Sequence, residues 1–466
     1  MKKSNKKLID KIFVFLLILI FLLIFLKTYS IHLKNPYPIH VDEWQHLAQI
    51  IAAESGRINY NPYFDEPHKD LELFFHSFWA AFFSIFKINE ILFYSFLPAI
   101  FSVLTALTLY FLMLKISNRI AALFSLIIIL NWKSNVSFLG IKYFTPLTMS
   151  FPLIYLSIFF FIKFSEKRTI KNFMAFVLIF LLTLLIYPPS GIILTYGFLI
   201  GLLIINKNKK NKLDLFLKFI AYFGLALILT GILFLYKNNL LEGLFLFKIG
   251  WSGYETKYSF VLLFSFTATL FAIFGIIKKI EDLKLRILII LSLLSLSLVF
   301  MFNTFDFTII VPYQRALHYS VIFLTPLAAI GIIEFLKIIT KRTNKLLGVF
   351  LAIVIFLLIL CSKYSKVNNQ ETYEWRVLEK RMYEKLNNIR QNYPENSITV
   401  MTPIYNTPAI YPVARQRAQA LLPAQLGAGY GQDERIIDNI KYYSKNTTLK
   451  EKEEIVRKWG VDVVLE

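Results

Sequence analysis

The sequence predicts a polytopic α-helical membrane protein, with about eleven membrane-spanning helices and a small α/β domain at its C-terminus. Hydrophobic residues make up 56% of the 466 residues and charged residues only 17%, and the mean hydropathy is +0.57; these values exclude an ordinary soluble surface. The apolar residues form runs separated by short clusters of lysine and arginine, a pattern typical of membrane topology signals. From about Ser362 the composition becomes that of a soluble protein.

The net charge of +21 raises nucleic acid as a partner. The basic residues, however, form no single face or tail, so we expect no nucleic-acid binding. The single cysteine, Cys361, excludes an internal disulfide. The N-terminal apolar run has no small-residue cleavage site before Pro36, and we interpret it as a retained helix.

The first predicted crossing is Ile12–Leu26, which follows a lysine-rich N-terminus. We therefore expect the N-terminus in the cytoplasm and residues 32–70 outside it. The apolar run Leu73–Phe86 is short for a hydrocarbon core of about 30 Å, so we expect a helix lying at the outer membrane surface.

The remaining crossings follow from the apolar runs and from the basic cluster that ends each inward pass. The motif Pro188-Pro189-Ser190-Gly191 is predicted to be a turn between two of them. The expected crossings are Ile91–Leu114, Ile120–Leu130, the segment between Pro146 and Lys163, Phe173–Ile186, Ile192–Ile205, Phe219–Tyr236, Phe260–Ile277, Ile287–Phe302, Val321–Leu336 and Leu346–Leu360.

The odd number of crossings puts the C-terminus on the outside. We expect a transmembrane domain over residues 1–361, whose first external loop, 30–90, carries the site, and a soluble extracytoplasmic α/β domain over 362–466. In this second domain the sequence predicts parallel strands and two helices, the second ended by Gly460. These elements are helix Tyr373–Arg390, strand Ser397–Met401, helix Leu449–Trp459 and strand Val461–Leu465.

Acidic residues within membrane helices are typical of ion-coupled transporters, and the centres of the predicted spans contain none. All six histidines fall in external or outer-surface segments. This distribution favours an enzyme that acts at the outer interface over a pump with a site at the membrane midplane.

The motif from His40 to His46 contains adjacent carboxylates, Asp42 and Glu43. Asp42 precedes a predicted amphipathic helix, Glu43–Glu54, and with Gln45 three residues later it is a candidate capping box. A carboxylate at a helix start can also take the proton from an acceptor hydroxyl. Both roles are compatible, because a cap holds a base in place.

His40, Glu43 and His46 have a spacing that suits a metal, although His40 precedes the helix. Asp65 and Glu66 in the same loop are further candidate contacts for an acceptor or a metal. A solvated, histidine-rich surface is the alternative. We expect no resident cofactor, with a divalent metal as the less favoured possibility.

Together these features resemble the GT-C glycosyltransferases, which include the protein O-mannosyltransferases, the aminoarabinose transferases of lipid A and the catalytic subunit of oligosaccharyltransferase. The resemblance covers the chain in architecture and includes its ending, Lys458-Trp459-Gly460-Val461-Asp462-Val463-Val464. It implies that Asp42 is the catalytic base, with Glu43 beside it to orient the acceptor. It also implies a polyprenyl-phosphate sugar donor presented from the outer leaflet.

Two departures qualify the resemblance. Oligosaccharyltransferases carry a further acidic residue or pair in the second external loop, whereas residues 131–146 contain no Asp or Glu, and the C-terminal segment has no Trp-Trp-Asp motif. This favours a metal-independent mechanism like that of the O-mannosyltransferases.

A phosphate-linked donor needs a cation near the breaking bond. The candidates are Arg315 at the outer end of a span, Lys142 and His318. Arg315 could instead pair with Asp306 or extend to the interface. We interpret Tyr143, Trp251, Tyr254 and Tyr313 as an interfacial aromatic belt.

The sequence therefore predicts an inverting glycosyltransferase of the plasma membrane that modifies an extracytoplasmic lipid, glycan or protein acceptor. The alternatives are a flippase or transporter for a lipid-linked glycan, and a surface polysaccharide polymerase or ligase. The expected partners are the polyprenyl-phosphate sugar, membrane lipids and the acceptor.

Overall fold

The computed structural model describes residues 3–33, 35–68, 70, 72–134, 139–205, 257–306, 311–342, 345–362, 378–422 and 433–466. Its contacts divide the chain into two compact units. The first unit comprises residues 1–27, 100–141 and 149–369, and the second comprises residues 28–99, 142–148 and 370–466. The predicted domain boundary at residue 361 thus adjoins a segment outside the described residues, and residues 28–99 group with the C-terminal segment.

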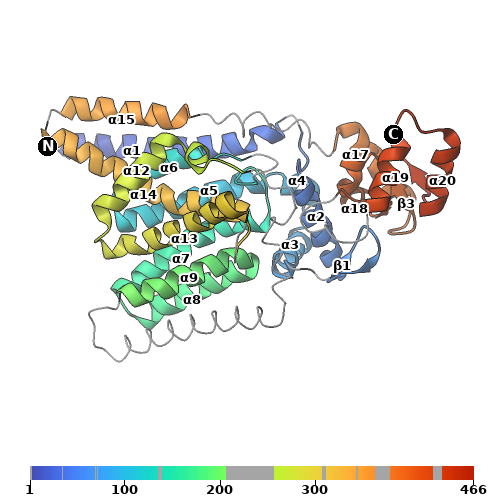
Figure 1. Cartoon of the computed structure of the whole chain (residues 1–466), viewed down its shortest axis with the longest axis horizontal. Coiled ribbons are helices and arrows are strands. Elements are labelled where there is room, and N and C mark those ends of the chain that lie inside the picture. The colour runs from blue at the N-terminus through green and yellow to red at the C-terminus, as the bar shows by residue number, and fades with distance from the viewer. Residues whose placement is uncertain are drawn as a thin grey trace. The chain divides into compact units, whose positions relative to one another are not determined.

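The first unit is a bundle of apolar helices (Figure 1). Within the described residues, five stretches are long and apolar enough to cross a membrane: Asp10–His32, Glu90–Ile116, Pro146–Glu166, Lys284–Phe305 and Tyr313–Lys341. Shorter apolar helices accompany them. Its helices are α1 (Lys3–Tyr29), α5 (Leu97–Ile116), α6 (Arg119–Leu130), α7 (Pro146–Glu166), α8 (Ile170–Ile186), α9 (Pro188–Ile205), α11 (Phe260–Phe264), α12 (Phe266–Lys279), α13 (Leu283–Phe305), α14 (Tyr313–Arg342) and α15 (Lys345–Leu360).

Each predicted crossing coincides with described helix except Phe219–Tyr236, which lies outside the described residues. The total of about eleven spans therefore stays a prediction. Two predicted runs are interrupted: Phe260–Ile277 breaks at Ser265, whose φ is 92°, and Ile91–Leu114 is divided into α4 (Glu90–Tyr94) and α5.

The predicted turn at Pro188-Pro189-Ser190-Gly191 is wrong, because these residues form the first turn of α9. A proline suits the first turn of a helix, since its missing N–H would have no intrahelical partner there and its φ already has a helical value. The carbonyl of Tyr187, the residue before α9, accepts the N–H of Ser190 at 3.0 Å.

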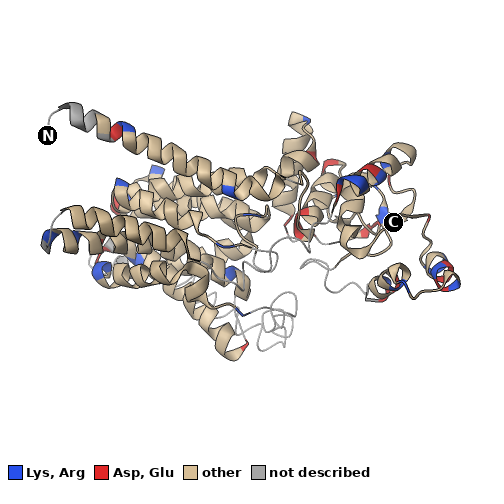
Figure 2. Ribbon diagram, turned by 90° about the horizontal axis from the view of Figure 1, so that it is seen from above, with Lys and Arg blue, Asp and Glu red and all other residues tan. Residues whose placement is uncertain are grey.

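Ion pairs gather the predicted cytoplasmic clusters at one end of the bundle. Glu166 of α7 pairs with Lys115 of α5 and, at 3.0 Å, with Lys284 of α13. Glu334 of α14 lies 3.5 Å from Lys279 of α12. Figure 2 shows that the charged residues of the bundle lie mainly at helix ends. The basic clusters that the topology prediction places on the cytoplasmic side are therefore neighbours in the fold. A chain that crosses the membrane back and forth requires this.

The second unit combines the loop after α1 with the C-terminal segment. Three short strands, β3 (Thr399–Met401), β4 (Arg417–Ala418) and β5 (Val463–Val464), pair in parallel in the order β4-β3-β5. The pairing of β3 with β5 confirms the parallel pairing predicted for these two segments. Its elements are α2 (Val41–Glu54), β1 (Tyr60–Asn61), β2 (Glu66–Pro67), α3 (Leu73–Phe86), α4, α17 (Lys380–Asn392), β3 (Thr399–Met401), α18 (Ile410–Ala414), β4 (Arg417–Ala418), α19 (Asp433–Tyr443), α20 (Leu449–Trp459) and β5 (Val463–Val464).

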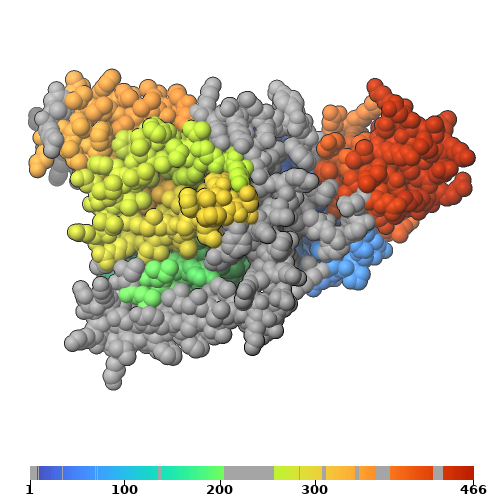
Figure 3. Space-filling model, viewed as in Figure 1, coloured from blue at the N-terminus to red at the C-terminus, as the bar shows by residue number. Residues whose placement is uncertain are grey.

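Tyr63, in the turn between β1 and β2, joins the two parts of this unit. Its hydroxyl donates to the carbonyl of Pro408 at 2.6 Å, and its own carbonyl accepts the N–H of Ala418 at 2.8 Å. In Figure 3 this hairpin (light blue) lies beside the C-terminal segment (red). The helix α19 was not predicted. Of the predicted helix Tyr373–Arg390, residues 373–377 lie outside the described residues, and the described helix begins at Lys380.

Candidate active site

The start of α2 is held by a capping box, but Asp42 is not its cap. His40 is the N-cap residue; its Nδ1 accepts the N–H of Asp42 at 3.1 Å. The third helical residue, Glu43, closes the box by accepting the N–H of His40 at 3.2 Å. The predicted Asp42–Gln45 box is therefore wrong, because the helix begins at Val41, two residues earlier than its apolar pattern indicates.

Glu43 is fully buried, and three backbone N–H groups surround its carboxylate. Oε2 accepts from Ile39 and His40, both at 3.2 Å, and Oε1 accepts from Phe144 at 2.8 Å. Burial raises the pKa of Glu43 to about 7, aided by the charge of Asp42 and opposed by the three backbone donors. Glu43 thus ties the start of α2 to the segment 142–148, which Tyr94 also anchors through a 3.0 Å bond to the carbonyl of Phe144.

Asp42 is placed differently from its neighbour. Its side chain keeps 10% of its surface exposed, and no hydrogen-bond donor among the described residues contacts its carboxylate. His40 Nδ1 lies 3.9 Å from Asp42 Oδ1, but this nitrogen accepts the Asp42 N–H and so carries no proton to share. The carboxylate is therefore fixed by the helix and remains able to accept a proton.

One helical turn after Asp42, His46 meets two residues at the start of α3. His46 Nδ1 lies 3.0 Å from His76 Nε2 and 3.4 Å from the Glu72 carboxylate. On its other side, His76 Nδ1 contacts Asp70 Oδ2 at 2.7 Å. Burial would raise the pKa of Asp70, but the His76 hydrogen bond and charge outweigh it and hold that pKa below its usual value.

Sequence reasoning missed Glu72 and His76, which form this cluster in place of the predicted set of His40, Glu43 and His46. Glu72 is the N-cap residue of α3, and His76 follows it by four residues, so both side chains lie on one side of the first turn of the helix. This spacing was the available signal. The packing of α2 against α3 then brings His46 to them, and that pairing has no local signal.

The other predicted loop residues lie apart from these groups. Asp65 is exposed at the β1–β2 turn, and Glu66 accepts a long 3.5 Å bond from Asn61. Tyr143 is fully buried against the His40 ring, with centroids 5.3 Å apart. Tyr313 is also fully buried and stacks on Phe302. These two tyrosines therefore do not form an exposed aromatic belt; Trp251 and Tyr254 lie outside the described residues.

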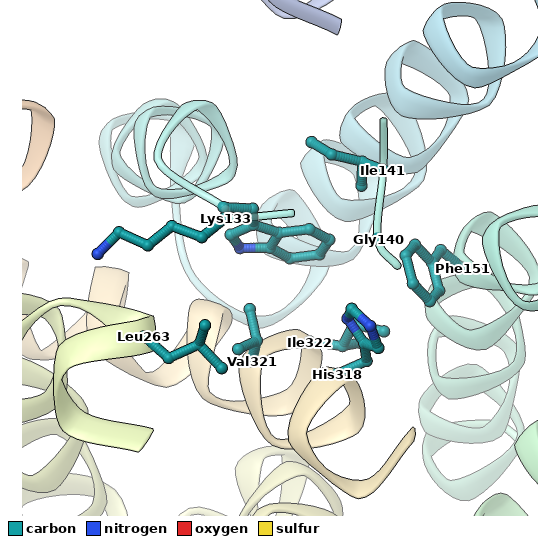
Figure 4. A pocket seen from close by; sticks show the side chains of 9 residues that line it. Lys133, Gly140, Ile141, Phe151, Leu263, His318, Val321 and Ile322 are labelled. Atoms are coloured by element: carbon teal, nitrogen blue, oxygen red, sulfur yellow. The ribbon is translucent and has the colours of Figure 1, made fainter. Parts of the chain in front are cut away.

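Two of the predicted phosphate-binding residues belong to α14 in the first unit. Arg315 Nε donates to the hydroxyl of Tyr187 at 2.8 Å. Asp306, the alternative partner of Arg315, pairs with Lys257 instead, at 2.6 Å. His318 lines a small cavity of about 10 Å³ with Gly140 and Phe151 (Figure 4), which has room for about one water molecule.

Lys142, the third predicted phosphate-binding residue, belongs to the second unit and is partly buried. The second unit also contains an open groove of about 590 Å³ at the C-terminal end of α2, lined by Glu54, Glu90 and Arg415 among others. Asp42 lies twelve residues earlier, about 18 Å along the helix.

Comparison with solved structures identifies the fold. The chain is similar to the archaeal oligosaccharyltransferase AglB from Archaeoglobus fulgidus in complex with an inhibitory peptide and a dolichol-phosphate, with a TM-score of 0.63 and 14% identity over 96% of this chain and 69% of that one. It is also similar to that organism's enzyme tethered with an acceptor peptide (TM-score 0.58, 15% identity, 95% and 68% covered) and to its complex with Zn and sulfate (0.60, 14%, 95% and 67%).

No protein-family model and no curated protein matches the sequence. At this level of identity the likeness concerns architecture, which extends over nearly the whole chain. The protein is an integral membrane protein that shares its fold with the archaeal oligosaccharyltransferase, a GT-C glycosyltransferase.

Proposed function

We propose that this protein is an inverting membrane glycosyltransferase that moves a sugar or glycan from a polyprenyl-phosphate carrier to an acceptor outside the cytoplasm. Asp42 is the general base. In this proposal the protein lies in the plasma membrane, with its N-terminus in the cytoplasm and its C-terminus outside. The fold supports the reaction class, since the structural neighbours include complexes with a dolichol-phosphate and with an acceptor peptide.

The state of the Asp42 carboxylate carries this proposal. A general base needs a fixed position and a free lone pair. The capping box of His40 and Glu43 provides the first, and the absence of a described donor at the carboxylate provides the second. Had Asp42 been the cap, the backbone N–H groups would have occupied its oxygens.

The reaction is one displacement at the anomeric carbon. The acceptor oxygen or nitrogen attacks as its proton passes to Asp42, and the bond from the anomeric carbon to the carrier phosphate breaks with its electron pair on the phosphate. Attack from the face opposite the leaving group inverts the configuration. In this scheme Glu43 is a positioning residue, because its oxygens hold backbone groups and set the start of α2.

The leaving phosphate gains negative charge, which a nearby cation would stabilise. Arg315 suits this role because Tyr187 orients its guanidinium. Lys142 and His318 complete the proposed donor set. The second unit, with its C-terminal α/β segment, would select the acceptor, and a peptide is the first acceptor to test.

The deciding experiment uses the full chain in lipid nanodiscs with a polyprenyl-phosphate sugar and a panel of peptide, lipid and glycan acceptors. Asp42→Asn should lower transfer by about 10² to 10⁴-fold, the usual contribution of a general base. Its thermal unfolding should match the wild type, because Asp42 makes no side-chain hydrogen bond in the described fold.

Asp65→Asn is the matched control, since Asp65 is an exposed acid of the same loop, and it should keep full activity. Full transfer by Asp42→Asn would refute the assignment. Vesicles that contain the donor and no acceptor test the flippase alternative: movement of the donor across the bilayer, unchanged in Asp42→Asn, would favour transport over transfer.

A further inference from the structure

The cluster of His46, Glu72 and His76 has the geometry of a three-ligand metal site. The two imidazoles are buried, the Glu72 side chain keeps 10% of its surface exposed, and one ligand atom from each residue lies within 4.8 Å of the others. Zinc binds nitrogen and oxygen at about 2.0 to 2.2 Å, so neighbouring ligands of a tetrahedral ion lie about 3.3 to 3.5 Å apart. The separations of 3.0 Å between the two histidines and 3.4 Å between His46 and Glu72 are close to these values.

The surroundings of His76 favour the same interpretation. Asp70 accepts the Nδ1 proton of His76 at 2.7 Å, which leaves the Nε2 lone pair directed at His46. A carboxylate that holds the far nitrogen of a ligand histidine is the usual support of a metal site, because it fixes the tautomer and makes the ligand nitrogen more basic. Phe75 packs edge-on against both imidazoles and restricts their rotation.

We propose that His46, Glu72 and His76 bind one zinc-type divalent cation, with Asp70 as the supporting residue. Two imidazoles and one carboxylate suit zinc and related transition metals, whereas magnesium and calcium prefer oxygen ligands alone. Three protein ligands leave one tetrahedral position open to water or substrate. The ion would lie about one helical turn from Asp42, since His46 follows Asp42 by four residues on α2.

This site differs from the set predicted by sequence spacing. Within the described fold, Glu43 faces three backbone donors, and His40 Nδ1 accepts the Asp42 N–H. Neither joins the cluster. A chain of hydrogen bonds from Asp70 through His76 and His46 to Glu72, without any metal, is the competing explanation of the same distances.

The test measures metal directly and needs neither donor nor acceptor, so its outcome is independent of the proposed transferase activity. Purified full chain is stripped with a chelator, dialysed against zinc, and analysed for bound metal by elemental mass spectrometry. Cobalt(II) substitution then reports the coordination through its visible spectrum. We expect about one zinc per chain and a tetrahedral cobalt spectrum.

Variants distinguish this site from adventitious binding. Glu72→Gln and His76→Ala should each abolish the stoichiometric zinc and the cobalt spectrum, and Asp70→Asn should weaken zinc binding by about 10- to 100-fold. His68→Ala, a histidine of the same loop outside the cluster, is the control and should bind zinc normally.

Two results would overturn the metal site. One is equal zinc binding by the wild type, Glu72→Gln and Asp70→Asn. The other is a folded wild type that takes up no zinc at tenfold molar excess, which would support the hydrogen-bond chain. Asp70→Asn leaves all three ligands in place, so the test remains decisive even if His76→Ala does not fold.

Discussion

The helix bundle of the first unit and the α2–α3 region of the second are both closely packed, but different forces hold them. In the bundle, α12 and α14 approach until the backbone of one meets the backbone of the other: a Cβ added at Gly331 would lie 1.9 Å from the carbonyl oxygen of Phe271. In the α2–α3 region, buried polar groups are matched instead, as the carboxylate of Glu43 is to three backbone donors.

The contrast shows where chemistry can be placed in this chain. The interior of the bundle is mostly apolar, and polar side chains within it form pairs, as Ser150 does with Ser190 at 2.8 Å. An unpaired charge buried there would be costly. The α2–α3 region keeps the Glu43 carboxylate and the imidazoles of His46 and His76 buried because neighbouring polar groups satisfy them. We therefore expect the bundle to be most sensitive to added side-chain volume, and the α2–α3 region to be most sensitive to the loss of a buried hydrogen-bond partner.

The largest effect is expected from Gly331→Ala in the bundle. The new methyl group would overlap a backbone carbonyl that cannot rotate away, so we expect a loss of about 3 kcal/mol or more, at the upper end for overpacking. Thermal unfolding in detergent measures it. Gly201→Ala is the matched control: its Cβ would lie 3.1 Å from the flexible end of Ile287, and the loss should stay below about 1 kcal/mol. Equal losses would contradict the backbone contact.

The next effect is expected from Glu43→Gln in the α2–α3 region. The amide nitrogen would replace an oxygen that faces backbone N–H donors, so at least one buried donor loses its acceptor, at a cost of about 1 to 3 kcal/mol. Thermal unfolding and the fluorescence of buried Trp44 report the loss. An unchanged unfolding temperature would show that these hydrogen bonds do not hold the start of α2.

The same variant has a pH dependence of predictable sign. The pKa of Glu43 rises from its ordinary 4.5 to about 7 in the fold, so the unfolded chain loses this proton first as the pH increases. Its contribution to stability is complete below about pH 4.5 and falls as the pH rises to about 7. Asp42 and Tyr94 are the titratable neighbours coupled to it. The stability difference between wild type and Glu43→Gln should therefore shrink from pH 4.5 to 7, and a difference that grows would reverse the assignment.

A comparable change, in substrate binding and not in stability, is expected from Arg315→Ala at the end of α14. Loss of a charge-assisted contact to the donor phosphate costs about 1.5 to 3 kcal/mol, which corresponds to about a 10- to 100-fold increase in the KM for the lipid-linked donor. The KM for the acceptor should not change. Tyr187→Phe, which removes only the hydroxyl that Arg315 contacts, should give a weaker shift of the same kind. Equal shifts for donor and acceptor would remove Arg315 from the donor site.

The smallest effect is expected from Lys257→Met, which breaks the pair with Asp306. Both side chains are largely in solvent, with 42% and 68% of their surfaces exposed. Exposed pairs contribute at most about 1 kcal/mol, so the unfolding temperature should change little. A large loss would mean that this surface pair matters as much to the bundle as its interior does.

The sequence alone determined the elements whose cause is local. The bounds of α3 were predicted to the residue from its apolar run. Gly460, with a φ of 55°, ends α20 as predicted. The apolar helices of the bundle and the basic residues at their ends were also predicted from the sequence. The length of a span and the cost of burying a charge depend only on nearby residues.

Only the tertiary structure decided which polar groups meet. His40 replaces Asp42 as the cap because α2 begins two residues earlier than predicted. The carboxylate of Glu43 accepts a hydrogen bond from the backbone of Phe144, 101 residues away. His46 joins His76 across a gap of 30 residues. Side-chain periodicity shows which face of a helix is apolar, but the partner of a polar group is set by how helices pack, and that depends on the whole unit at once.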